Sequence, residues 1–90
     1  MSKVNLNVLN TASKEVEEVE FLKATIKGTT GAFLIKESYG GASVWIVDVD
    51  NVDFNNVDSV KTFLTEKGNT GESETFDSLE EAEDEFAEVF

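Results

Sequence analysis

The sequence predicts an α+β fold: a mostly antiparallel sheet of four or five strands, with two helices in the C-terminal half that pack on it. Three observations support this prediction. The run Ser43 to Phe54 is the most hydrophobic of the chain and contains its single Trp. Both alternating faces of its first half are apolar, which is typical of a central strand covered on two sides. Apolar runs joined by glycine-containing turns precede it, and two stretches with helical spacing follow it. We therefore expect a meander around a strand at residues 43–52.

The N-terminal segment has the pattern of a strand with one buried face. Val4, Leu6 and Val8 alternate with polar residues, which predicts a first strand. Residues 10–13 are polar and predict a connection.

The next segment predicts a hairpin. Residues 14–20 fit either a helix or a strand by their spacing, and we favour a strand from about Val19. The reason is the turn Gly28-Thr29-Thr30-Gly31 and the apolar run at residues 32–37, which together complete a hairpin. Tyr39-Gly40-Gly41 predicts a second tight turn into the Trp-containing strand.

A helix is expected after the central strand. Asn55 or Asn56 is a suitable N-cap, and Asp58 lies in the first turn, where the helix dipole favours an acid. Lys67 and Gly68 predict its end. The apolar residues of one face are Val57, Val60, Phe63 and Leu64. Residues 74–76 are expected to add a short edge strand.

The last helix is predicted from a capping box, Ser78 with Glu81, and is expected to run to about Val89. Its expected core face consists of Leu79, Ala82, Phe86, Val89 and Phe90. The opposite side carries Glu80, Glu81, Asp84, Glu85 and Glu88, with Glu83 at the margin. No Lys is present there to form an i,i+4 ion pair.

Composition limits the classes of function. Ninety residues suffice for one domain with a single modest core. The chain contains no His, Cys or Arg, so the common general base, the thiol nucleophile and the bidentate phosphate clamp are missing. We expect no catalytic residues, no cofactor and no enzyme activity. The formal net charge of −12 repels nucleic acid and anionic membranes and attracts basic protein surfaces. No apolar leader segment begins the sequence, and a cytoplasmic protein is expected.

The acids of the last helix are the main candidate binding site. Six acids between residues 80 and 88 span about 13 Å of helix, or one charge per ~2 Å, compared with ~1.7 Å along duplex DNA. This side of the helix could therefore imitate a phosphate backbone. The alternative is a solvated outer surface that keeps the protein soluble.

Three further acids follow the central strand. Asp48, Asp50 and Asp53 suggest a cation site, since hard cations prefer carboxylate oxygens. Their spacing does not match an EF-hand, because Val52 and Asp53 stand where that loop needs a ligand and a Gly. We expect no metal here. These acids could instead be solvated residues at a strand end, or part of one negative surface with the acids of the last helix.

The aromatic residues have two interpretations. Trp45, Tyr39, Phe33 and Phe54 could form a base-stacking platform, but such platforms lie in basic grooves and this chain has 19 acids against seven Lys. Core packing is the better interpretation.

These features predict a small, non-enzymatic binding protein that blocks a basic, nucleic-acid-binding surface of another protein by imitating phosphates. In size, acidity and the lack of a catalytic set, the chain resembles small phage-encoded inhibitors of host defence, such as DNA-mimic anti-restriction and anti-CRISPR proteins. An immunity protein that neutralises a basic nuclease toxin is an alternative, because it too would use an acidic surface to bind a basic one. Two interpretations belong to different functional classes: an oligomer-forming accessory protein, for example a homodimer, and a cation-binding or small-ligand module near Asp48 and Asp50.

Overall fold

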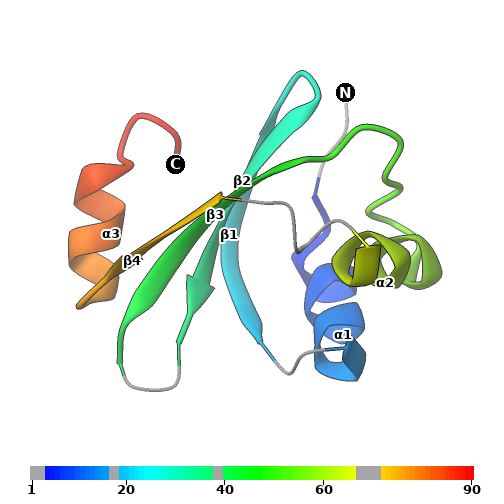
Figure 1. Ribbon diagram of the computed structural model, residues 1–90, viewed down its shortest axis with the longest axis horizontal. Coiled ribbons are helices and arrows are strands. Elements are labelled where there is room, and N and C mark those ends of the chain that lie inside the picture. The colour runs from blue at the N-terminus through cyan, green and yellow to red at the C-terminus, as the bar shows by residue number, and fades with distance from the viewer. Residues whose placement is uncertain (1–3, 17–18, 38–39, 67–71) are drawn as a thin grey trace.

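The computed structural model describes residues 4–16, 19–37, 40–66 and 72–90 (Figure 1). Within these ranges the chain forms a four-stranded antiparallel meander in the order β1-β2-β3-β4, together with three helices. The expected α+β class is therefore confirmed. The elements in chain order are α1 (Leu6–Val16), β1 (Glu20–Lys27), β2 (Thr30–Lys36), β3 (Ala42–Asp48), α2 (Val57–Glu66), β4 (Glu72–Phe76) and α3 (Leu79–Glu85).

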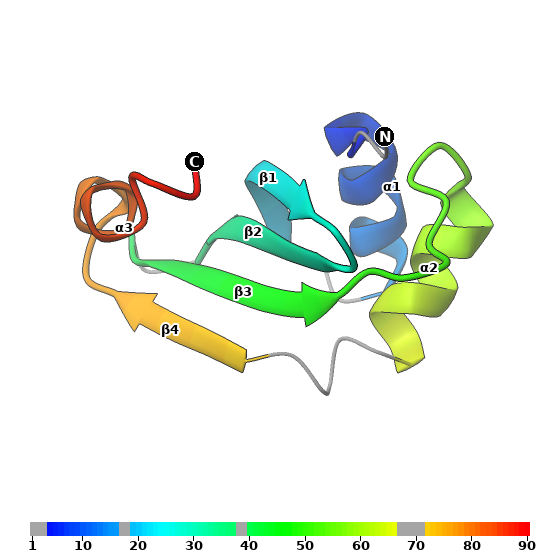
Figure 2. The same ribbon diagram turned by 90° about the horizontal axis from the view of Figure 1, so that it is seen from above.

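The sheet separates two apolar clusters, so the molecule has three layers. Figures 1 and 2 show α3 on one side of the sheet and α1 with α2 on the other. Alternation along each strand explains this arrangement, because successive side chains point to opposite faces. Phe33 and Trp45 face α1 and α2 in the larger cluster, whereas their neighbours Leu34 and Val44 face α3 in the smaller one. The prediction that the central strand is covered on both sides is confirmed for Val44 and Trp45, whereas Ile46, two residues after Val44 on the same face, is exposed.

The predicted hairpin is confirmed. β1 and β2 pair from Glu20↔Lys36 to Lys27↔Thr30, with a bulge between Phe21 and Lys23. Gly28 has φ +61, which a residue with a Cβ rarely adopts. Part of the predicted turn at residues 39–41 lies outside the described residues, and Gly40 within it has φ +82.

The predicted first strand at residues 4–8 is wrong, as is the polar connection at 10–13, because α1 spans most of both segments. Asn5 begins the helix: its side-chain Oδ1 accepts hydrogen bonds from the backbone N–H of Asn7 (3.1 Å) and Val8 (3.3 Å). The residues that α1 buries are Leu9, Ala12 and Ser13. Their spacing follows the 3.6-residue period, which was hidden because Val4, Leu6 and Val8 also alternate.

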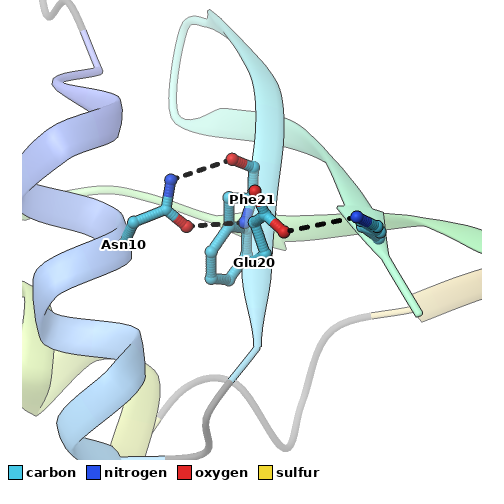
Figure 3. A network of polar contacts seen from close by, with 4 residues as sticks. Asn10, Glu20 and Phe21 are labelled. Carbon is cyan, nitrogen blue, oxygen red and sulfur yellow. Dashed lines mark hydrogen bonds and ion pairs between the residues drawn. The ribbon is translucent and has the colours of Figure 1, made fainter. Parts of the chain in front are cut away.

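A side chain of α1 closes the free edge of β1. Asn10 donates from Nδ2 to the backbone carbonyl of Phe21 (3.0 Å) and accepts at Oδ1 from the Phe21 N–H (2.7 Å). Figure 3 shows this pair of bonds beside the Glu20–Lys36 ion pair, which joins β1 to β2. The amide therefore takes the place of a neighbouring strand at this position.

The central strand is shorter than the predicted 43–52, because β3 ends at Asp48. The Asp48 side chain accepts a hydrogen bond from the N–H of Asp50 (3.0 Å), and Asn51 has φ +65. This side-chain bond and the left-handed residue turn the chain away from the sheet. Val49 still donates to the carbonyl of Thr29 (2.7 Å), so the ladder extends one residue further.

Helix α2 confirms the prediction for residues 57–66. Asn56 is its N-cap, since its Oδ1 accepts from the N–H of Ser59 (3.2 Å) and its carbonyl accepts from Val60 (3.1 Å). Val60, Phe63 and Leu64 are buried against α1 and the sheet. The predicted end at residues 67–68 lies outside the described residues. The predicted edge strand near residues 74–76 is confirmed as β4.

None of the helices in the described part of the chain has the length and the hydropathy that a membrane crossing requires.

Candidate functional site

Helix α3 presents most of the candidate acids on an anchored scaffold. Ser78 caps the helix by accepting at its side chain from the N–H of Glu81 (3.2 Å), as the sequence predicted. The predicted core side is confirmed: Ala82 is fully buried, and the remaining members pack against the smaller cluster, namely Leu79, Phe86, Val89 and Phe90. The opposite side, which we call the acidic face, consists of Glu80, Glu81, Asp84, Glu85 and Glu88, all exposed.

The helix is shorter than predicted, because it ends at Glu85 and not near Val89. Phe86 departs from helical geometry (φ −109, ψ 26), and the following turn is closed by hydrogen bonds from the N–H groups of Val89 and Phe90 to the Phe86 carbonyl. Two physical factors favour this ending. The last turn contains no basic residue to complement the helix dipole. The turn also lets Val89 and Phe90 return to the cluster. Glu88 therefore follows the helix and does not continue the row of Glu80 and Asp84.

The acidic face has no ion-pair partner among the described residues. Glu83, at the margin of the helix, pairs with Lys23 of β1 (3.7 Å), both about half exposed. The other ion pairs, Lys36–Glu20 and Lys61–Glu15, lie on other elements. The charges of the acidic face are therefore left to solvent or to a binding partner.

The second group of acids, Asp48, Asp50 and Asp53, which we call the acidic loop, lies where β3 leads into α2. Asp53 is engaged locally: its N–H donates to Ser59 Oγ (3.0 Å) and its Oδ1 accepts from the N–H of Asn55 (3.0 Å). Asp48 and Asp50 line a groove of about 540 Å³ together with Glu66 and polar residues of α2. In the ranges that the structure describes, no three carboxylates converge closely enough to hold a metal ion.

The structure separates the two groups of acids. Figure 1 shows α3 and α2 at opposite ends of the longest axis, and the acidic loop lies at the α2 end. The interpretation that joins both groups into one continuous negative surface is therefore wrong. A flat partner surface would contact one group or the other.

A feature that the sequence did not reveal lies beside the acidic face. An apolar groove of about 170 Å³ opens between the sheet and the C-terminal turn. Thr25, Ala32 and Ile46 stand opposite one another on three adjacent strands and form its floor. Phe86 and Val89 form the wall. We call this feature the apolar groove. No local pattern could indicate it, because its residues come from three separate parts of the sequence.

The aromatic residues form core, as expected. Trp45 is 8% exposed and stacks on Phe63 with ring centroids 5.7 Å apart. Phe33 and Phe54 are buried in the same cluster. Tyr39, the fourth residue of the imagined platform, lies outside the described residues. The stacking surfaces of Trp45, Phe33 and Phe54 are thus used within the protein.

No protein-family model matches the chain, and no curated protein or solved structure is significantly similar to it.

Proposed function

We propose that this chain is a non-enzymatic inhibitor that covers a basic, nucleic-acid-binding surface of another protein, in the manner of phage anti-defence proteins that imitate DNA. The observation that supports the proposal is the acidic face. Its helix is anchored by an apolar cluster, while its five carboxylates are exposed and pair with no cation in the described part of the chain. Fixed and unpaired carboxylates are suited to bind Lys and Arg side chains that otherwise contact phosphates.

Because α3 is shorter than predicted, the charged patch that could imitate phosphates is also shorter. Five acids lie within the seven residues of α3, so the charge density along the helix remains close to that of duplex DNA over about 10 Å. Glu88 extends the negative surface beyond the helix end. A patch of this length corresponds to a few phosphates, which fits a compact basic site better than a long DNA-binding channel.

The proposal is tested by removing charge from the acidic face and, separately, from the acidic loop. The first variant combines Glu81→Gln, Asp84→Asn, Glu85→Gln and Glu88→Gln. The control combines Asp48→Asn, Asp50→Asn, Asp53→Asn and Glu66→Gln, which removes the same number of charges at the other end of the molecule. Asn keeps the Oδ1 acceptors that Asp48 and Asp53 use locally. The matched change in net charge separates a local interface from general attraction.

The binding partner would be captured from a bacterial lysate at low salt, and its affinity measured by titration at two salt concentrations. We expect the acidic-face variant to lose at least tenfold in affinity, about 1.4 kcal/mol, while the control retains most of it. Binding by the parent should weaken with salt, because exposed charges are screened beyond about 8 to 10 Å, and should compete with duplex DNA. Loss of binding only in the control would move the site to the acidic loop. A captured nuclease toxin would indicate an immunity protein.

A further inference from the structure

The apolar groove exists because α3 covers only part of its face of the sheet. The covered half contains Leu34 and Val44, which are buried under the helix. In the next pair of the β2–β3 ladder on this face, Ala32 is still buried in the same cluster, but Ile46 opposite it is not. Ile46 is 36% exposed and is the exposed large hydrophobic residue of the described ranges. Neighbouring positions on this face carry Thr25, Lys27 and Thr30, as expected for a solvated sheet surface.

Charge around the apolar groove indicates the kind of molecule that fits it. Glu85 and Glu88 flank the wall residues Phe86 and Val89 in the chain, and both are exposed. Lys27 is the cation among the lining residues that the structure describes. The lining thus combines an apolar floor with one cation, and the acids nearest to its wall residues along the chain are Glu85 and Glu88 of the acidic face.

A basic protein surface fits this combination better than the other candidates. A second copy would bring another net charge of −12, so it would be repelled. Nucleic acid and anionic membranes are repelled for the same reason. A basic surface that presents one aliphatic side chain is complementary in both respects. The groove volume of about 170 Å³ suits one such group, because a cavity of about 150 Å³ already accommodates benzene.

We propose that the apolar groove receives a Leu, Ile or Met side chain of the basic partner, while flanking Lys or Arg residues bind the acidic face. The inference rests on the proposed function and adds a feature that would select among basic partners. Charge attracts many basic surfaces, and the groove selects those with an aliphatic side chain at the right place. Interfaces commonly combine a buried apolar anchor with a charged rim in this way.

Two synthetic peptides of equal length and charge test the inference with the intact protein. Both are rich in Lys, and one carries a central Leu where the other carries Ser. We expect the parent to bind the Leu peptide at least about tenfold more tightly, since burial of one aliphatic side chain accounts for that ratio. The Leu peptide should also shift the methyl NMR signals of Ile46 and Val89, whereas the Ser peptide should not.

A matched pair of substitutions locates the effect. Ile46→Thr places a hydroxyl group in the apolar floor. Ile46→Val keeps the floor apolar with a side chain of nearly the same shape as Thr, so the two variants differ mainly in polarity. The ratio of the two peptide affinities should fall to near one in Ile46→Thr and stay well above one in Ile46→Val. Equal affinities for both peptides in the parent, or an unchanged ratio in Ile46→Thr, would overturn the inference.

The acidic-face variant distinguishes this failure from failure of the proposed function. If that variant binds both peptides as tightly as the parent does, the acidic face is not what attracts basic chains, whatever the groove does. If the acidic-face variant loses affinity for both peptides while the parent shows no preference for the Leu peptide, the role of the acidic face in binding is supported and the groove proposal fails.

Discussion

The pair of hydrogen bonds from Asn10 to β1 gives a sharp test of how α1 is held on the sheet. Asn10→Ala removes both bonds and leaves the Phe21 N–H and carbonyl without their partner at the edge of the sheet (Figure 3). An unsatisfied buried group costs about 1 to 3 kcal/mol. Asn10 is only partly buried, so water can replace part of each bond. We therefore take about 2 to 3 kcal/mol for the two bonds together.

Helix propensity partly offsets this loss, because Ala is favoured over Asn in a helix by up to about 0.7 kcal/mol. The expected net destabilisation of Asn10→Ala is about 1.5 to 2.5 kcal/mol. For a domain of this size it corresponds to a decrease in melting temperature of about 6 to 20 °C.

The matched control is Asn7→Ala, one helical turn earlier. Asn7 is exposed, and its side chain forms no hydrogen bond with the described residues. Asn7→Ala gains the same propensity without losing a bond, so its stability should equal or slightly exceed that of the parent. Both variants would be measured by urea denaturation with circular dichroism. If Asn10→Ala is as stable as Asn7→Ala, the amide does not hold α1 to the sheet.

Three other predictions concern α3 and the acidic loop. Leu79→Ala and Phe86→Ala should each lower the free energy of unfolding by about 1 to 3 kcal/mol, below the usual core range because both side chains are only partly buried; unchanged urea midpoints would mean that α3 is not docked. Ser78→Ala should cost about 1 kcal/mol by removing the N-cap, whereas Ser78→Asp should restore it, in the same assay. Millimolar calcium should not raise the melting temperature beyond the effect of matched ionic strength; a calcium-specific rise of several degrees would establish a cation site in the acidic loop.

Local sequence patterns predicted an element correctly where its apolar spacing and capping residues favour the same structure as its packing in the fold. The alternation of Val44 and Trp45 identified the two-sided central strand, and Ser78 with Glu81 identified the start of α3. At the N-terminus the signals conflicted. Val4, Leu6 and Val8 satisfy the period of a strand, and only packing against α2 and the sheet selects the helical period that buries Leu9.

The candidate site was predictable only in part. Four members of the acidic face, Glu80, Glu81, Asp84 and Glu85, follow from helical spacing within one segment, whereas Glu88 lies after the end of the helix. The separation of the acidic loop from α3 depends on the path of the chain through the sheet, which local spacing does not specify. The apolar groove depends also on where α3 ends, since a helix continuing to Val89 would not have formed the turn whose residues make its wall.

The sheet isolates the apolar cluster under α3 from the larger cluster under α1 and α2, and this has a consequence for local stability. A segment at a chain end with its own small cluster can open while the rest of the protein stays folded. Residues 77–90 would then exchange their amide hydrogens with solvent faster than β2 and β3, whose amides lie between both clusters. The carboxylates of the acidic face would be ordered only for the fraction of time that the segment is closed. A partner that binds the closed form would slow this exchange, and its measured affinity would include the free energy of closing the segment.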